Sequence, residues 1–282
     1  MRAGKIEVNS SIIRLMNHII YLNIVVSLAA GVLAMGVAEY HGVEMSKWIG
    51  LFGYLATFTV YNGQRLIKTK FMTLTPWLSW VHKNRSWIIA LVIFHAAFAM
   101  YVLLTRLSLS AEHMALLFIV AMISVLYVIR IGTQNLRDIP HLKIHLIAVS
   151  WSIMLVVFPM LFADVTLHKV FIWFLAHYFF VLGITIPFDI RDLKYDQIHQ
   201  RTIPQVYGAS RARIIAVLAI LLFSVMLLYL EQTLWSNVIF YTAVLTQILL
   251  IILMHKERGD LYCAGAIDGA IAVLGLAYFI SA

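Results

Sequence analysis

The sequence is short of charge, cysteine and proline. Only 12% of its 282 residues are charged, whereas a soluble domain contains about 25%. Its one cysteine, Cys263, excludes an internal disulfide, and no low-complexity block or Pro/Gly/Ser-rich linker divides the chain. The scarcity of charge excludes an ordinary soluble protein, and the absence of linkers predicts a single domain over residues 1–282.

Long apolar runs take the place of the missing charge. Hydrophobic residues make up 62% of the sequence, and a helix needs about 20 mostly apolar residues to cross a bilayer. Nine such runs recur, separated by short polar connections. They span Met16–Ala38, Trp48–Leu66, Trp87–Thr105, Met114–Ile131, Ile144–Phe162, Val170–Pro187, Ile214–Leu230, Val238–His255 and Ala264–Ile280. The pattern predicts an all-α, polytopic membrane protein with nine transmembrane helices.

Basic residues concentrate on one side of this topology. With a cytoplasmic N-terminus, all 21 Lys and Arg residues except Lys47, Arg106 and Lys169 fall in inside segments. Because basic loops stay in the cytoplasm, the distribution predicts an integral protein of the inner (cell) membrane with its N-terminus inside. The net charge of +8 then reflects basic loops beside the lipid bilayer, and no nucleic-acid partner is expected.

One stretch places aspartates directly after an apolar run. This stretch, FDIRDLKYDQIHQRTIPQVYG, Phe188–Gly208, follows Pro187, which is expected to close or kink the helix. If the helix continues past Pro187, the side chains of Asp189, Asp192 and Asp196 share one side of it. Like charges at this spacing repel unless a cation compensates them. Mg²⁺ binds carboxylates together with phosphate oxygens, so the stretch indicates a magnesium site for a phosphorylated ligand. The alternative is a solvated inner loop in which the aspartates pair with Arg191, Lys194 and Arg201.

The same stretch resembles the second aspartate-rich motif of the UbiA superfamily of intramembrane prenyltransferases. That motif has a form near D-x-x-D-x-x-x-D, followed by basic residues and T-[IL]-P. The positions in register are Asp189, Asp192, Asp196, Arg201, Thr202 and Pro204. A weaker likeness lies in LRDIPHLKIHLIAVSW, Leu136–Trp151, which includes Lys143.

The resemblance implies a fold, a ligand and a reaction. In this family a helical bundle surrounds a central cavity, and Mg²⁺ ions bridge aspartates at its cytoplasmic mouth to a prenyl diphosphate. The isoprenoid tail lies in an apolar tunnel, and diphosphate release leaves an allylic cation that an acceptor attacks. Asp189, Asp192 and Asp196 are then expected to be the catalytic and metal-binding residues.

The first motif of the family is degenerate in this sequence. Its form is N-x-x-x-D-x-x-x-D, and the corresponding stretch here is TVYNGQRLIKTK. Asn62 matches, but the aspartate positions fall on Leu66 and Lys70, and no acidic residue occurs between Glu44 and Glu112. The loops therefore lack the carboxylates for two complete Mg²⁺ clusters.

Three consequences of this loss remain open. In the first, basic residues replace one metal cluster by binding diphosphate oxygens directly, and Arg65, Lys68 and Lys70 are suited to do so. Alternatively, the donor is not an ordinary prenyl diphosphate, or the cavity binds or moves a lipid without ionising it. The simpler interpretation of Lys68 and Lys70 is that they only mark the cytoplasmic side.

Other polar residues complete the predicted site. The expected substrate-binding set is Asn62, Arg65, Lys68, Tyr127, Arg130, Lys143 and Arg201. Asp268 lies within the last apolar run, where an acid is costly unless it faces a polar interior.

The favoured function is Mg²⁺-dependent transfer of an isoprenoid from a prenyl diphosphate to an aromatic or other lipophilic acceptor. One alternative is terpene cyclisation, in which the cation is attacked by its own double bonds. Another is a non-catalytic protein that binds or transports a polyprenyl lipid.

Overall fold

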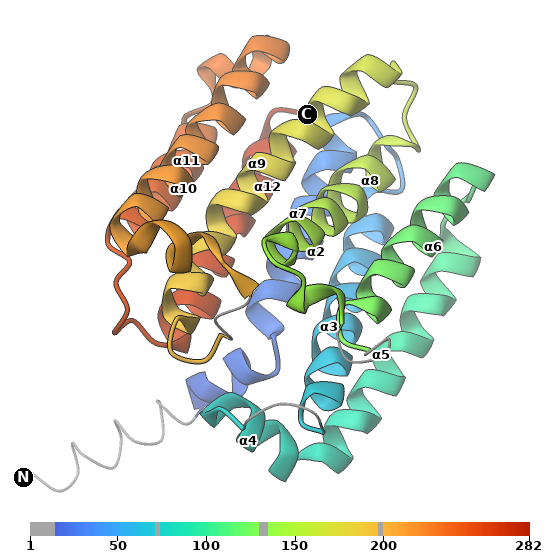
Figure 1. Ribbon diagram of the computed structural model, residues 1–282. Helices are drawn as coiled ribbons and strands as arrows, with labels where there is room; N and C mark the ends of the chain where they lie inside the picture. Colours follow the sequence, from blue (N-terminus) through green and yellow to red (C-terminus); the bar gives the residue numbers. More distant parts are fainter. Residues whose placement is uncertain (1–14, 71–73, 130–134, 197–199) are drawn as a thin grey trace, which may run out of the picture.

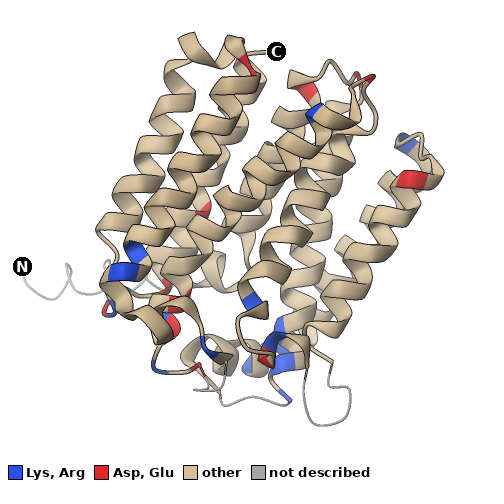
Figure 2. Ribbon diagram, turned by 45° about the horizontal axis from the view of Figure 1, so that its top comes forward, with Lys and Arg blue, Asp and Glu red and all other residues tan. Residues whose placement is uncertain are grey.

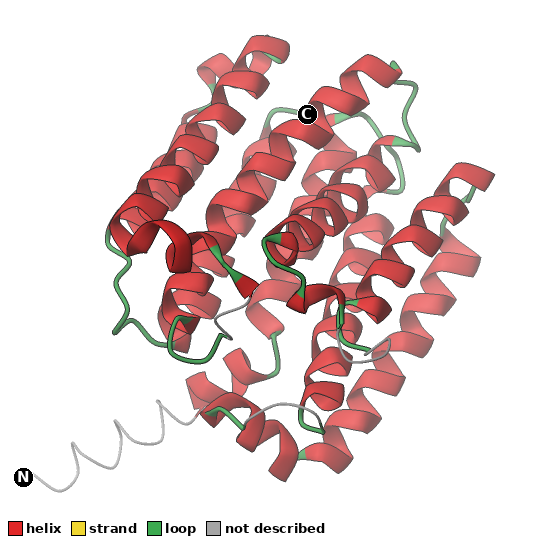
Figure 3. Cartoon of the chain, in the orientation of Figure 1, coloured by secondary structure: helices red, strands yellow, loops and turns green. Residues whose placement is uncertain are grey.

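The described part of the chain is built from helices joined by short connections (Figures 1 and 3). The computed structural model describes residues 15–70, 74–129, 135–196 and 200–282. Figure 3 draws no strand among these residues. The all-α fold class predicted from the apolar runs is therefore confirmed.

Each predicted span has a helical counterpart. In chain order these are Leu15–Tyr21 with α2 (Ile24–Tyr40), α3 (Ser46–Lys68), α5 (Arg85–Arg106), α6 (Ala111–Leu126), α7 (Leu142–Ser152) with η2 (Ile153–Val157) and α8 (Phe158–Met160), α9 (Leu167–Asp192), α10 (Ile203–Leu230), α11 (Val238–Ile252), and η5 (Leu261–Ile267) with α12 (Asp268–Ile280). Three short helices, α4 (Pro76–Lys83), η1 (Leu136–Asp138) and η4 (Gln232–Ser236), were not predicted.

Membrane-spanning length is met by only some of these helices. Among the described residues, five helices are long and apolar enough to cross a membrane, or six if one bent pair counts as a single span. The apolar helices α6 and α11 are shorter. The count of nine transmembrane helices stays a prediction.

The first span is broken, and the break is held by an asparagine of α3. Leu15–Tyr21 and α2 meet at an angle of 55°, and Asn23 between them has a left-handed φ of 56°. The Asn62 amide donates to the freed Leu22 carbonyl at 2.8 Å and accepts a hydrogen bond from the Asn23 amide at 3.0 Å. These contacts satisfy polar groups that have no water to bind inside a bilayer.

Helix α2 lies in the middle of the bundle, in contact with α3 and α12 (Figure 1). Two glycines allow the closest approach: a Cβ on Gly36 would lie 2.0 Å from the Gly275 carbonyl oxygen of α12. Small residues at such crossings let membrane helices pack backbone to backbone. This tight contact lies in the half of α2 that ends at Tyr40.

Helix α9 carries the aspartate motif to one end of the bundle. The sequence predicted that the helix closes or kinks at Pro187, but it continues to Asp192. Proline removes one backbone hydrogen bond and need not end a helix that is packed on both sides. Contacts with α7 and α10 supply that packing. The continuation places Asp189 in the last turn, where its side chain is buried.

Candidate functional site

A cavity of about 660 Å³ opens between α3, α6, α7, α9 and α12. Its inner wall is apolar, and the contributing residues include Phe52, Val60, Leu117, Ile147, Leu155 and Val181. Charged residues gather mainly at one end of the bundle (Figure 2). The cavity lining contains eight basic and six acidic residues. The cavity therefore joins a charged mouth to an apolar interior.

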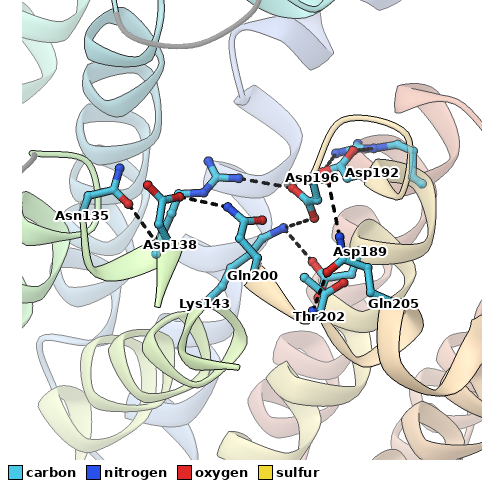
Figure 4. A network of polar contacts seen from close by, with 11 residues as sticks. Asn135, Asp138, Lys143, Asp189, Asp192, Asp196, Gln200, Thr202 and Gln205 are labelled. Atoms are coloured by element: carbon cyan, nitrogen blue, oxygen red, sulfur yellow. Dashed lines mark hydrogen bonds and ion pairs between the residues drawn. The ribbon is translucent and has the colours of Figure 1, made fainter. Parts of the chain in front are cut away.

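Lys143 connects two of the predicted aspartates. Its Nζ atom lies 2.8 Å from Asp189 Oδ1 and 2.8 Å from Asp196 Oδ2 (Figure 4). The contact with Asp196 has hydrogen-bond geometry. Only 9% of the Lys143 side chain is exposed, against 2% for Asp189 and 5% for Asp196. One ammonium group therefore lies where a cation is needed between two buried carboxylates.

The third aspartate has a different partner. Arg191 donates from Nε to Asp192 Oδ1 at 2.8 Å and from Nη2 to Asp192 Oδ2 at 3.0 Å. Its Nη1 atom lies 3.1 Å from Asp260 Oδ1, in the connection between α11 and η5. Bidentate arginine–carboxylate contacts are strong and fix geometry. Arg191 therefore holds Asp192 and anchors the Asp260 segment to the end of α9.

A 3₁₀ turn before α7 completes the polar network. Arg137 Nη2 lies 3.6 Å from Asp196 Oδ1, and Gln200 donates to Asp138 at 3.0 Å (Figure 4). Burial disfavours the charged form of Arg137, but Tyr127 and Asp196 outweigh this and raise its pKa. Arg137 is therefore a permanent positive charge beside Asp196.

Two cations of α3 line the same mouth without carboxylate partners. The Arg65 guanidinium carbon lies 3.6 Å from the centroid of the Trp77 ring, and Lys68 Nζ lies 5.2 Å from the centroid of the Tyr127 ring. Both side chains are half-buried and line the cavity. Among the described residues, neither has a carboxylate oxygen within 4 Å. Aromatic faces orient these cations but do not replace a carboxylate as an ion-pair partner.

The structure separates the predicted residues of α3 into two groups. Arg65 and Lys68 line the cavity, whereas Asn62 is fully buried behind Asn23 and is absent from the lining. The two positions aligned with the lost aspartates also lie outside the lining: Leu66 packs in an apolar cluster and Lys70 is exposed. A helix that places residues 61, 64, 65 and 68 toward the cavity turns residues 66 and 70 away.

The remaining predicted residues are distributed unevenly. Tyr127 and Lys143 line the cavity with the three aspartates, and Asp268 does so from the first turn of α12. Arg201 is exposed, has a left-handed φ of 47°, and is not among the lining residues. Arg130 lies outside the described residues.

Sequence reasoning missed the partners of the motif. Arg137 and Asp260 were not singled out, and Arg191 was considered only as a nearby loop cation. No local pattern marks Asp260 as a neighbour of Arg191, because they are 69 positions apart and meet only in the folded bundle. Arg137, by contrast, lies within Leu136–Trp151, the segment that the sequence did identify.

The aspartates do not fit an open magnesium site in this arrangement. Across the described ranges, no group of three His, Cys, Asp or Glu side chains is placed to hold a metal ion. The Lys143 ammonium lies between Asp189 and Asp196, and the Arg191 guanidinium covers both oxygens of Asp192. The expected metal role of these three residues therefore has no support in their geometry.

Comparisons with known proteins show which solved structures have a similar fold. No family model matches the sequence, and no curated protein is similar to it in sequence. A UbiA homolog from Archaeoglobus fulgidus has a similar structure, with a TM-score of 0.60 and 15% identity over 94% of this chain and 99% of that chain.

Two further solved structures have a fold similar to that of this chain. A UbiA homolog from Archaeoglobus fulgidus bound to GPP and Mg²⁺ has a TM-score of 0.58 and 13% identity over 95% of this chain and 98% of that chain. A structure concerning digeranylgeranylglyceryl phosphate synthase has a TM-score of 0.52 and 14% identity over 94% and 98% of the two chains. The suspected resemblance is confirmed at the level of the fold, and the chain is an integral membrane protein with a UbiA-like fold.

Proposed function

We propose that this protein is a UbiA-like prenyltransferase that transfers an isoprenoid from a prenyl diphosphate to an aromatic or other lipophilic acceptor. The observation that carries the proposal is the cavity, which joins a cationic mouth to an apolar interior within a UbiA-like fold. GPP and DMAPP are bound in solved structures of that fold. Both ligands combine a diphosphate with an apolar chain, as the two parts of this cavity do.

The reaction breaks one bond and forms another. The bond between C1 of the prenyl group and the diphosphate oxygen breaks, and its electron pair leaves with the diphosphate. Cationic side chains at the mouth stabilise the charge that develops on this leaving group. A nucleophilic atom of the acceptor then attacks the allylic cation, and the acceptor loses a proton.

The interior of the cavity protects the cation. Its apolar walls limit water, which would otherwise capture the cation and give a prenyl alcohol. The rings of Phe52, Tyr61, Trp151 and Phe188 also line the cavity, and aromatic faces attract positive charge. Acceptor and isoprenoid therefore meet in a largely dry, ring-lined space.

Magnesium supplies electrostatic stabilisation of diphosphate when it is bound in this fold, and neighbouring structures contain it. In this chain the three aspartates are each held by lysine or arginine. The steps above therefore rely only on the protein's own cations, and Mg²⁺ dependence is a quantity to measure.

A second candidate function is lipid binding or transport without ionisation. The cation-paired aspartates favour it, because they leave no open carboxylate site for the metals of the resembling enzymes. Terpene cyclisation differs from both candidates in its product, which forms without an acceptor.

The membrane orientation belongs to the same proposal. Most basic residues gather at the cavity end of the bundle (Figure 2), and positive-inside topology puts that end in the cytoplasm. The site then faces the cytoplasmic side of an inner (cell) membrane, where water-soluble diphosphate is released.

Diphosphate release by purified protein in lipid nanodiscs tests the proposal. A series of prenyl diphosphates is supplied with and without an aromatic acceptor and with Mg²⁺ or EDTA, and both diphosphate and isoprenoid products are measured. We expect release that Lys143→Met lowers by about 10²- to 10³-fold, whereas Lys70→Met, outside the cavity lining, retains the wild-type rate.

Each result of this experiment has a distinct meaning. Prenylated acceptor supports transfer, and cyclic hydrocarbon formed without acceptor supports cyclisation. Binding of the donor by folded protein with no release from any donor contradicts both enzymes and favours lipid binding or transport.

A further inference from the structure

The charge distribution at the mouth differs from what a metal-bridged diphosphate site requires. Metal clusters need carboxylates that are free to bind the ions, and here those carboxylates form ion pairs within the protein. The pairs are Lys143 with Asp189 and Asp196, and Arg191 with Asp192 and Asp260. The carboxylates of the motif thus each hold a cation within ion-pair distance.

The α3 wall of the mouth carries cations that form no ion pair with a described carboxylate. Arg65 and Lys68 come from consecutive turns of α3, both line the cavity, and neither has a carboxylate within 4 Å among the described residues. Their aromatic neighbours hold them in place without neutralising them. Two half-buried cations without a carboxylate at ion-pair distance favour an anion from outside the protein.

The positions of these cations explain how they can replace lost carboxylates. The residues aligned with the family aspartates, Leu66 and Lys70, do not line the cavity. Arg65 and Lys68 do, so the side of α3 that meets the ligand is basic. A guanidinium binds two phosphate oxygens at once, and an ammonium binds as a compact charge.

We propose that the mouth binds the phosphate or diphosphate end of its ligand directly through Arg65 and Lys68, without a bridging divalent metal ion. This inference rests on the proposed function only for the identity of the lipid, because the anion site itself is built from residues at the mouth. Lys143 and Arg137 line the same cavity from other elements, and each is ion-paired with an aspartate, so Arg65 and Lys68 are the cations that carry the proposal.

Binding of inorganic diphosphate to the full chain in lipid nanodiscs tests the proposal without requiring turnover. Titrations are performed by calorimetry in EDTA and in Mg²⁺, at low and high ionic strength. We expect the affinity in EDTA to be within about threefold of that in Mg²⁺ and to fall as salt rises.

Matched variants locate the site on α3. Lys68→Gln is expected to weaken binding by about 10- to 100-fold, and Arg65→Gln with Lys68→Gln to weaken it further. Lys70→Gln removes the same charge two residues away, outside the lining, and is expected to bind like the wild type. Thermal unfolding of each variant shows that it is folded, and Lys68→Gln should melt at or above the wild-type temperature because it removes an uncompensated charge.

The outcomes separate this inference from the transfer reaction. Diphosphate binding in EDTA without release from any prenyl donor supports the metal-free site and contradicts the transferase. Release that requires Mg²⁺, with binding lost in EDTA and restored by Mg²⁺, supports the transferase and overturns the metal-free site. Absence of diphosphate binding to folded wild type in both conditions, or equal weakening by Lys70→Gln and Lys68→Gln, also overturns it.

Discussion

The two ends of the bundle both bury charge, but they compensate it differently. At the end away from the cavity, Glu231 accepts hydrogen bonds from Trp173 Nε1 at 2.7 Å and from the Tyr40 hydroxyl at 3.0 Å. Lys169 Nζ lies 2.8 Å from the same carboxylate. One acid is thus satisfied by three partners from α2 and α9, and none of these residues lines the cavity described above.

At the cavity end, some charged side chains have no ion-pair partner among the described residues. Arg65 and Lys68 face the cavity without carboxylate partners, and the side chain of Asp268 has no hydrogen bond or ion pair to another described residue. Buried polar groups without partners cost stability. The comparison therefore distinguishes an end that serves the fold from an end that is built for a ligand.

Removal of Glu231 should have the largest effect on stability. Glu231→Ala leaves the Trp173 donor and the Lys169 charge unpaired, and we expect it to lower the free energy of unfolding by about 3 kcal/mol. Denaturant unfolding in detergent measures this change. Glu44→Ala, an exposed acid at the same end, should change it by less than about 0.5 kcal/mol. Equal losses in both variants would contradict a structural role specific to Glu231.

Tight packing is the second property that distinguishes the far end. In Gly36→Ala the new Cβ would lie 2.0 Å from the Gly275 carbonyl oxygen, so α2 and α12 must separate. We expect the free energy of unfolding to fall by about 2 to 3 kcal/mol, as is typical when extra atoms are forced into a packed interface. Gly63→Ala adds the same atom where nothing lies within 4 Å, and alanine favours a helix, so its thermal unfolding temperature should not fall.

The far end and the cavity end also differ in how much of them the sequence could predict. Apolar runs located the long helices, because membrane thickness sets their length. The break at Asn23 was not predicted, because it depends on an amide from α3 that satisfies the freed carbonyl. Helix α4 was missed because its eight residues are too few for a span.

The candidate site was predicted only where its residues are neighbours in sequence. The spacing of the aspartates and the Lys143 segment pointed to residues that the structure brings together. Asn62 was placed in the site by its position in a motif, but its side chain instead bonds to the Leu22 and Phe58 carbonyls. Spacing identifies the side of a helix, and only the packed bundle decides which side meets the cavity.

The two buried acids, Glu231 and Asp268, should respond to substitution with opposite sign. Asp268→Asn removes an acid that has no hydrogen bond or ion pair to another described residue and lies in an apolar span, so we expect it to raise the free energy of unfolding by about 1 kcal/mol. Denaturant unfolding beside Glu231→Ala makes the comparison direct. A loss of stability in Asp268→Asn would show that the carboxylate is compensated, and it would remove the distinction between the two ends.

The smallest expected effect is a pH dependence at the far end. Burial, with help from the positive charge of Lys169, lowers the pKa of His41 to about 4, below its usual value of about 6.5 in an unfolded chain. The unfolded state therefore binds the proton first as pH falls, so this contribution to stability is complete above about pH 6.5 and is lost progressively toward pH 4. We expect a loss of about 1 kcal/mol between pH 7 and pH 5.5 in the wild type, seen as a lower thermal unfolding temperature. His41→Asn should reduce that slope, whereas His168→Asn, an exposed histidine at the same end, should retain it. The same slope in His41→Asn as in the wild type would assign the pH dependence to the ionic mouth instead.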